Sequence, residues 1–422
     1  MKYIFLFFSF LFFAQIHSQE VAVFDFSKSL RIDFQLIGDV KTSDVLITQL
    51  KEEPFWGGSE KNLIYPNYGE LRLQLMDMET QKIVFSKGFN SLFNEWLHTE
   101  AAKTEKRMFS HAIQVPFPTK TLKLHIEKRN YQGKFDVIFE KSINPNDYFI
   151  KKEKITSYLI KKLLENGKSA QKVDLVILAE GYTADEIEKF YADAQRMTDY
   201  MFTIPPFNEL KKDFNVYAVG VSSQESGTDI PGKHVFKQTA FDASFYTFDM
   251  ERYLTTNNMA AIADAASLVP YDQIYILVNT KTYGGGGFYN HLNLATADDS
   301  LSEKVFVHEF GHGFAGLADE YYTSSTAFDA YYNLKIEPWE ENITSMVNFE
   351  RKWKDMVHKT TPIPTPRTDK YQKSIGVFEG GGYVSKGIFS PMQDCRMKSN
   401  DPKGFCPVCR RAIRNVVKFH TD

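Results

Sequence analysis

The hydrophobic pattern of this chain changes near residue 172, and that change restricts the folds that the chain can adopt. Before it, apolar and polar residues alternate in short runs such as 30–36, 70–75 and 121–126, with turn residues between them. Alternation with period two is typical of strands that bury one face. Short strands separated by turns favour an antiparallel β-sandwich.

After this point the pattern indicates strands that alternate with helices. The run 173–179, which is apolar apart from Asp174, is expected of a buried parallel strand, and further strands are predicted at 214–221 and 274–278. A capping box at 183–186 begins a predicted helix that runs to about residue 202, and another helix is predicted at 259–268. Strands alternating with helices indicate an α/β layer, so the whole chain is expected to have an α+β fold.

The length of the chain, 422 residues, is too great for one ordinary hydrophobic core, so more than one domain is expected. The Lys-rich stretch 148–168 has a helical pattern and is interpreted as a connector. The predicted organisation is a signal peptide at 1–18, a β-sandwich domain at 19–147, a connector at 148–172 and an α/β domain at 173–422.

The N-terminus has the features of a secretory signal peptide. Lys2 precedes an apolar run that ends at about Ala14, and a polar stretch follows up to Gln19. The run is too short to span a bilayer, no later run is long enough, and no Cys lies near the expected cleavage site at Ser18 to carry a lipid. We therefore expect a secreted or periplasmic protein without a membrane span. The net charge of -3 gives no reason to expect nucleic acid as a partner.

Three cysteines, Cys395, Cys406 and Cys409, lie near the C-terminus. In an exported protein this odd number indicates one disulfide and one free thiol. The Cys-x-x-Cys pair could instead be redox-active or half of a zinc site. Both alternatives are less favoured, because no second Cys pair and no His at zinc-finger spacing accompany it.

Two histidines four residues apart provide the most specific chemical signal. Residues 301–317 have a helical pattern, so His308 and His312 project from one face on successive turns. This spacing suits two ligands of one zinc ion, and Glu309 can reach a metal-bound water as a general base. The alternative is a surface helix whose histidines are merely polar.

The residues after this pair indicate a third ligand. A catalytic zinc needs three protein ligands and one open position. Gly313 and Gly316 would let the chain reverse sharply and return an acidic residue to the metal. We take Asp319 as the third ligand, with Glu320 as its competitor; an acidic residue that is simply solvated is the alternative to both.

Four glycines at 284–287 precede this helix. No Gly-Lys-Ser/Thr follows them, so they are not a phosphate-binding loop, and a flexible turn is expected. The alternating segment 289–295 could form an edge strand beside the helix.

The segment 308–320, His-Glu-Phe-Gly-His-Gly-Phe-Ala-Gly-Leu-Ala-Asp-Glu, resembles the signature of the bacterial IgA-peptidase family of zinc metallopeptidases, which are similar to metzincins. The resemblance covers nearly the whole mature chain, including the family's N-terminal domain. It implies a secreted zinc-dependent endopeptidase with a metzincin-like catalytic domain at 173–422 that cleaves protein substrates. The other segments that resemble the family are 88–96, 174–183, 223–229, 378–383, 394–397 and 405–409.

The chain departs from the metzincin pattern in two places. Ala315 stands where metzincins place a Gly, and Ala318 stands where they place the third ligand. The position of the third ligand therefore cannot be read directly from the metzincin pattern. Ser399 stands where some metzincins carry a Tyr. Tyr383, on a glycine-rich loop, would then polarise the substrate carbonyl; the alternative is a packed aromatic in that loop.

The resemblance also implies a role for Met397, which would pack beneath the zinc ligands without binding the metal. A disulfide from Cys395 to Cys409 would clamp this turn, with Cys406 as the other partner considered. An ordinary core methionine is the alternative.

Two other functions remain open at the level of the sequence. The first is a glycopeptidase that acts on glycosylated proteins, since aromatic residues and a β-sandwich suit such substrates. The second is a non-catalytic host-protein-binding protein on the same fold. The intact residues His308, Glu309 and His312 argue against the second.

Overall fold

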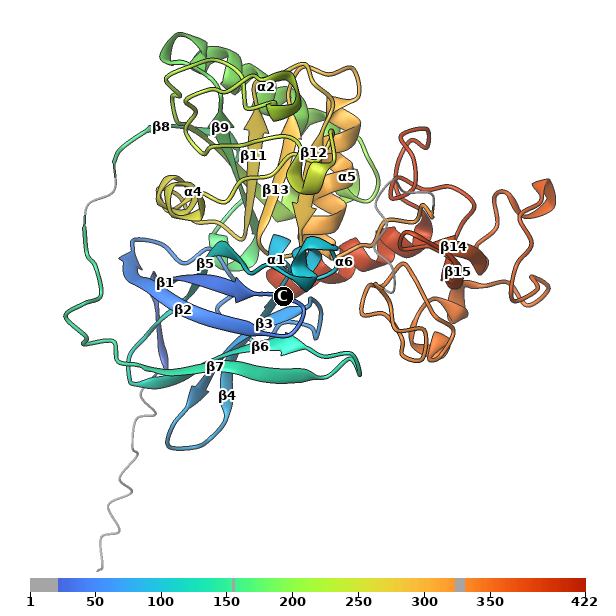
Figure 1. The fold of residues 1–422 in the computed structure, drawn as a ribbon, viewed down its shortest axis with the longest axis horizontal. Coiled ribbons are helices and arrows are strands. Elements are labelled where there is room, and N and C mark those ends of the chain that lie inside the picture. The colour runs from blue at the N-terminus through green and yellow to red at the C-terminus, as the bar shows by residue number, and fades with distance from the viewer. Residues whose placement is uncertain (1–21, 154–155, 323–330) are drawn as a thin grey trace, which may run out of the picture.

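Two antiparallel sheets form the N-terminal part of the protein (Figure 1). The computed structural model describes residues 22–153, 156–322 and 331–422. One sheet has the strand order β2-β1-β5, and the other has the order β4-β3-β6-β7. The elements are β1 (Phe24–Gly38), β2 (Ser43–Glu53), β3 (Leu71–Asp77), β4 (Ile83–Phe89), α1 (Leu92–Trp96), β5 (Arg107–Pro118), β6 (Leu122–Arg129) and β7 (Phe135–Ile143).

The inner faces of these two sheets share one hydrophobic core. Leu30 and Ile32 of β1 meet Leu73 of β3 and Leu124 of β6 in that core, and all four side chains are fully buried. Alternate residues of β3 are buried, which is the period-two pattern of the sequence. The prediction of an N-terminal antiparallel β-sandwich is confirmed.

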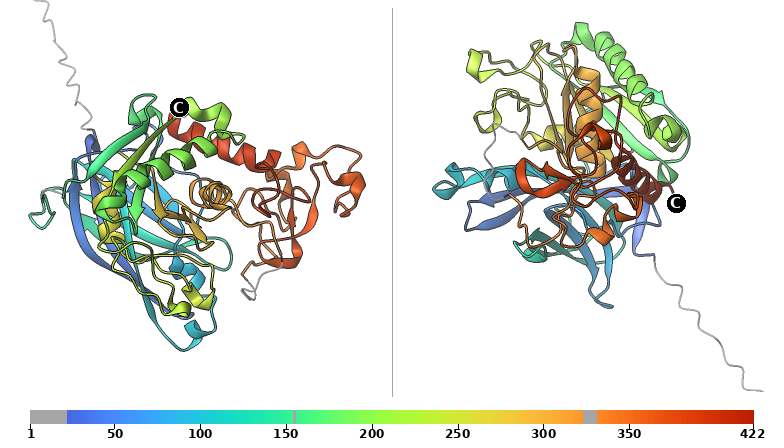
Figure 2. Two further views of the ribbon diagram at one scale, coloured as in Figure 1. Left: turned by 90° about the horizontal axis from the view of Figure 1, so that it is seen from above. Right: turned by 90° about the vertical axis from the view of Figure 1, so that its right-hand side faces the viewer.

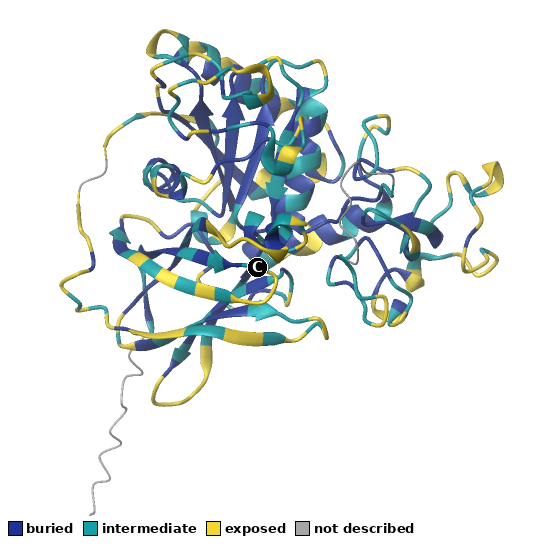
Figure 3. Ribbon diagram, viewed as in Figure 1, coloured by how far each residue is buried: buried dark blue, intermediate teal, exposed yellow. Residues whose placement is uncertain are grey.

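A six-stranded mixed sheet organises the rest of the chain, with the order β12-β13-β11-β9-β10-β8. The four inner strands run parallel, and the edge strands β8 and β12 run antiparallel to their neighbours. The central strands are buried along their whole length (Figure 3). The strands are β8 (Leu159–Leu164), β9 (Val173–Glu180), β10 (Phe214–Gly220), β11 (Gln273–Val278), β12 (Gly285–Phe288) and β13 (Leu292–Thr296).

Three local predictions for this sheet are wrong. The Lys-rich stretch expected to be helical contains β8, because pairing with β10 overrides its helical propensity. Three of the four glycines expected to form a flexible turn, at 285–287, belong to β12. The segment 289–295 contributes to β13, which lies inside the sheet, so the edge strand is β12.

Helices cover both faces of this sheet. On one face α2, α5 and α6 pack against Leu175 and Ile177 of β9, and on the other face α4 packs against Val176 and Leu178. The predicted capping box is present, since the side chains of Thr183 and Glu186 bond each other's backbone amides ahead of α2. The helices are α2 (Ile187–Met201), α3 (Phe207–Leu210), α4 (Met259–Ala266), α5 (Ser302–Ala315) and α6 (Pro407–Thr421).

The described residues between α5 and α6 form a region beside the six-stranded sheet and the N-terminal sheets, drawn on the right in Figure 1 and in the left view of Figure 2. Its regular elements are β14 (Phe378–Gly381) and β15 (Val384–Ser390), which pair with each other. The final helix α6 then returns to the centre of the molecule, where the side-chain amide of Asn62 donates to the backbone carbonyl of Phe419 at 2.8 Å. This contact ties the end of the chain to the N-terminal part.

The expected signal peptide at 1–18 lies outside the described residues. Among the helices that are described, none is long and apolar enough to cross a membrane. The domain boundaries at residues 147 and 172 stay predictions.

Candidate metal centre

The helix α5 holds His308 and His312 on one face. Its opposite face is anchored in the core by Phe306, Phe310 and Phe314, which are fully buried. The anchored face fixes the rotation of the helix, so the two imidazoles project into a cavity of about 440 Å³. Their Nε2 atoms lie 3.1 Å apart.

Backbone carbonyls orient both rings. The Nδ1 atom of His308 lies 2.8 Å from the carbonyl oxygen of Arg396, and that of His312 lies 2.5 Å from the carbonyl oxygen of Leu317. A carbonyl only accepts, so each Nδ1 donates and carries the proton. The Nε2 atom of each neutral ring is then left with its lone pair toward the cavity, which is the arrangement of metal-binding histidines.

Gly316 ends α5 and reverses the chain. It adopts a left-handed conformation with φ of 60°, and its amide donates to the carbonyl of His312. Gly313 has a different role, because a Cβ there would lie 1.9 Å from Oδ1 of Asn293 on β13. Of the two predicted turn glycines, Gly316 makes the turn and Gly313 permits close packing.

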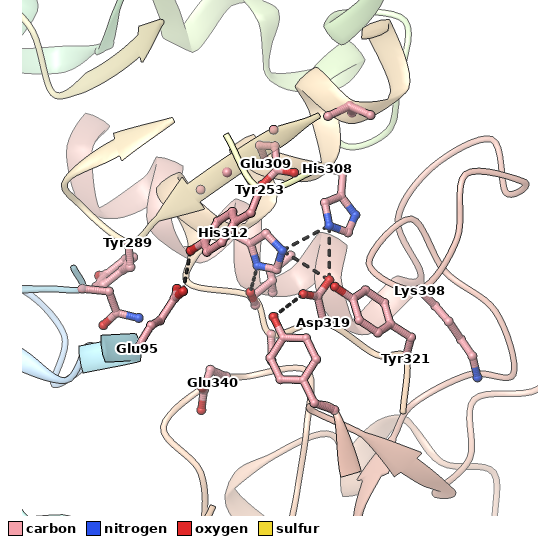
Figure 4. Close-up of a pocket in the computed structure, with 18 of the residues that line it drawn as sticks. Glu95, Tyr253, Tyr289, His308, Glu309, His312, Asp319, Tyr321, Glu340 and Lys398 are labelled. Carbon is pink, nitrogen blue, oxygen red and sulfur yellow. Dashed lines mark hydrogen bonds and ion pairs between the residues drawn. The ribbon is translucent and has the colours of Figure 1, made fainter. Parts of the chain in front are cut away.

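After the reversal, Asp319 faces the two histidines (Figure 4). Its Oδ1 lies 3.2 Å from Nε2 of His308 and 3.3 Å from Nε2 of His312. Three ligands bound tetrahedrally to zinc at 2.0–2.1 Å are about 3.3 Å from one another. The separations of these three atoms therefore fit one four-coordinate zinc ion. Glu320 points elsewhere, and its Oε1 lies 3.2 Å from Sγ of Cys409.

The charges of these groups are strongly coupled. Burial lowers the pKa of His312, but the charge of Asp319 outweighs burial and raises that pKa to about 9. The same opposing effects raise the pKa of His308. Burial raises the pKa of Asp319, but the two histidines hold it well below its usual range. A cation bound between the three groups competes with the ring protons, so its binding strengthens as pH rises.

Glu309 lies at the edge of the same group, with its carboxylate within 4.8 Å of the ligand nitrogens of both histidines. Burial raises its pKa, and the charges of the histidines partly offset that rise. Strand β12 lies directly against it, because a Cβ on Gly285 would be 2.8 Å from Oε1 of Glu309. The glycines of β12 thus leave room for the carboxylate beside the sheet edge.

Tyrosines surround Asp319. The hydroxyl of Tyr383 donates to Oδ2 of Asp319 at 2.6 Å, and the ring of Tyr321 packs edge-on to Tyr383. The backbone amide of Gly382 donates to the carbonyl of Asp319, so the hairpin that carries Tyr383 also holds the main chain of this turn. Sequence reasoning did not single out Tyr321, although it follows the signature directly.

The N-terminal part also reaches the cavity, through Glu95 and its hydrogen bond from the hydroxyl of Tyr253. Burial raises the pKa of Glu95 to about 7. Sequence reasoning missed both residues as members of the site, although Glu95 lies in the segment 88–96 that resembles the family.

Met397 lies beneath α5, as predicted. A Cβ on Gly311, between the two histidines, would be 2.7 Å from Sδ of Met397. The carbonyl of Met397 accepts from the amide of Glu320 at 2.7 Å, so this turn and the acidic segment are joined.

The predicted disulfide between Cys395 and Cys409 is wrong for this structure. The two sulfurs are 3.8 Å apart, against about 2.05 Å in a disulfide, and all three cysteines are free. The physical reason is that Cys406 and Glu320 share the same buried cluster, so Cys395 and Cys409 have other partners.

The chain matches two known family models. The chain matches the family described as IgA Peptidase M64 over residues 161–373 and 367–417, more than half of its length. It matches the family described as Peptidase M64 N-terminus over residues 22–140. A search of curated proteins found no match.

Proposed function

The chain belongs to the IgA peptidase M64 family of metallopeptidases, and from that membership we propose that it is a zinc-dependent endopeptidase whose metal is held by His308, His312 and Asp319. One observation carries the choice of ligands. The three ligand atoms are separated by 3.1, 3.2 and 3.3 Å, which suits one tetrahedral ion and leaves the fourth position toward the cavity. The donor set of two imidazoles and one carboxylate is among those that zinc prefers.

When bound, zinc would supply the Lewis acidity that makes water nucleophilic near neutral pH. Glu309 is the proposed general base: it accepts a proton from the attacking water and returns it to the leaving amine nitrogen. Burial raises the pKa of Glu309 above its ordinary value of 4.5, which makes the carboxylate a better acceptor for the proton of the attacking water.

Tyr383 is the proposed donor to the substrate carbonyl oxygen. Its hydroxyl lies at the same site and bonds Asp319 at 2.6 Å, so a bound substrate would have to compete with that carboxylate oxygen for the hydroxyl. A donor placed where negative charge develops stabilises the transition state. The bond to Asp319 also supports a second role, in which Tyr383 orients the third ligand.

The substrate is proposed to be a protein that engages both halves of the chain. The active-site cavity shares Tyr331, Tyr332, Trp339 and Glu340 with a neighbouring cavity of about 710 Å³. The other side of the second cavity is lined by residues 128–133, which are the end of β6 and the turn after it. The volume and the aromatic lining of this cavity favour the glycopeptidase alternative over any other second function, because an attached glycan could occupy it.

One experiment tests the proposal against the non-catalytic alternative. A protein library is digested with the full chain, with and without a chelator, and the new termini are read by mass spectrometry. We expect cleavage that stops with the chelator and returns with added zinc. No new termini under any metal condition would favour a binding protein, and cleavage confined to glycosylated segments would favour the glycopeptidase.

We further propose that the protein acts outside the cytoplasm, which the N-terminal sequence motivates.

A further inference from the structure

A second cluster of metal-binding side chains lies in the core behind the candidate site. It consists of Cys395, Cys406, Cys409 and Glu320, whose ligand atoms all lie within 4.8 Å of one another. The four residues are at most 5% exposed. None of them is used in the proposed catalytic mechanism, and a protein interior rarely gathers three thiols and a carboxylate without a partner for them.

The distances in this cluster are those of a tetrahedral metal site. The sulfurs of Cys395 and Cys409 are 3.8 Å apart, and two sulfurs on a zinc ion with bonds of 2.3 Å are separated by about 3.8 Å. Oε1 of Glu320 lies 3.2 Å from Sγ of Cys409, near the value of about 3.5 Å for a sulfur and an oxygen on one zinc ion.

Backbone amides point at the sulfurs. The amide of Cys406 donates to Sγ of Cys395 at 3.2 Å, and the amide of Cys409 donates to Sγ of Cys406 at 3.5 Å. Cys406 caps the 15-residue helix α6, where the positive end of the helix dipole favours negative charge. Both features stabilise thiolates, which are the form that binds metal.

Glu320 provides an independent sign of a missing cation. Its Oε2 is buried and has no hydrogen-bond partner among the residues that the structure describes. Its Oε1 accepts from the side-chain amide of Asn342 at 3.0 Å, which fixes the carboxylate toward the sulfurs. Burial of a carboxylate oxygen without a partner is unfavourable unless a cation or a hydrogen-bond donor meets it.

We propose that Cys395, Cys406, Cys409 and Glu320 bind a second, structural zinc ion. Three thiolates and a carboxylate complete four-coordination, which is typical of zinc sites that stabilise a fold and hold no open position. Binding replaces the thiol protons, which pass to solvent, and involves no oxidation.

This ion would fix the segments that hold the catalytic ligands. Glu320 follows Asp319 directly, and its amide bonds the carbonyl of Met397. Arg396, next to Cys395, accepts from Nδ1 of His308 through its backbone carbonyl. The proposed ion would therefore link two segments to α6: the backbone at Arg396, which orients His308, and the turn that carries Asp319.

Metal analysis of the purified full chain tests the proposal. We expect two zinc ions per chain in the wild type. The double variant His308→Ala/His312→Ala should keep one, and the double variant Glu320→Gln/Cys395→Ser should keep one at most. Glu340→Gln replaces another buried glutamate and should keep two. If the wild type and the histidine variant each contain one zinc ion, the proposed catalytic site does not bind zinc and the proposed second site does.

Cobalt substitution decides the question even where the cysteine variants do not fold. Cobalt bound by thiolates shows sulfur-to-metal absorption in the near ultraviolet, and cobalt bound by histidines and a carboxylate does not. We expect that absorption in both the wild type and the histidine variant. Its absence from both proteins would overturn the proposal. A cross-link between two of the three cysteines in the non-reduced protein would overturn it as well.

Discussion

Asp319 and Glu320 are consecutive residues whose carboxylates belong to two different clusters. Oδ1 of Asp319 lies 3.2 Å from Nε2 of His308, and Oε1 of Glu320 lies 3.2 Å from Sγ of Cys409. The amide of Glu320 bonds Met397, and the carbonyl of Asp319 accepts from Gly382, so the peptide between them is held on both sides. A single turn thus supplies one acidic group to each cluster.

This arrangement predicts different effects for the two carboxylates. Asp319→Ala should weaken zinc binding at the histidine pair by more than about 100-fold, since loss of a direct ligand exceeds the loss of an outer-shell partner. The measurement is the zinc concentration that restores half of the peptidase activity to the apoprotein. Glu320→Gln is the matched variant and should weaken binding less, by about 10- to 100-fold, because Glu320 acts on the site only through the turn that carries Asp319. If Asp319→Ala regains activity at the zinc concentration that reactivates the wild type, and Glu320→Gln regains no activity, Glu320 is the third ligand.

Glu309→Gln should retain the fold and the zinc but lose turnover by about 10²–10⁴-fold, because the proton acceptor is gone while the ligands remain. Peptide cleavage rates and zinc content are measured on the same preparation. Glu303→Gln on the same helix serves as control, since Glu303 pairs with Arg196 and lies outside the cavity. Near-normal cleavage by Glu309→Gln would remove Glu309 from the mechanism.

Tyr383→Phe should lower kcat by about 10²-fold with little change in zinc content, because a donor to the developing oxyanion is lost. Tyr321→Phe is the matched control, since Tyr321 packs against Tyr383 and also interacts with Asp319. A fall in zinc affinity for Tyr383→Phe, with kcat restored at saturating zinc, would restrict Tyr383 to positioning Asp319.

The sequence allowed the histidine helix and the main architecture to be predicted, because both depend on short-range periodicity. Helix geometry alone places His308 and His312 on one face, and the burial of β9 shows in the apolar run 175–179. The roles of Glu309, Asp319 and Tyr383 stay predictions.

Other features depend on contacts that no local pattern encodes. Strand β12 needs glycine because α5 passes close to it. A Cβ on Gly287 would lie 2.4 Å from the carbonyl oxygen of Glu309. The sequence alone presents the same residues as a turn. Likewise Glu320 and Cys409 are 89 positions apart, so their meeting in one cluster follows only from the return of α6 to the core.

Glu340 is one of the buried glutamates whose raised pKa makes the stability of the folded protein depend on pH. It is 6% exposed, its Oε2 has no hydrogen-bond partner among the described residues, and Tyr332 donates to its Oε1 at 3.0 Å. Burial, with a further contribution from the charge of Glu70, raises the pKa of Glu340 to about 7 from an ordinary 4.5. The folded protein therefore binds this proton more tightly than the unfolded chain does.

A group of this kind contributes stability that is fully present below pH 4.5 and is lost as pH rises through about 7. Glu340→Gln keeps the acceptor for Tyr332 and removes the charge. The free energy of unfolding of this variant should therefore rise relative to that of the wild type by up to about 3 kcal/mol between pH 5 and pH 8. The difference is measured by urea unfolding at fixed zinc, with Glu60→Gln as the control at an exposed position. A difference between Glu340→Gln and wild type that stays constant across this pH range would show that Glu340 does not change its charge there.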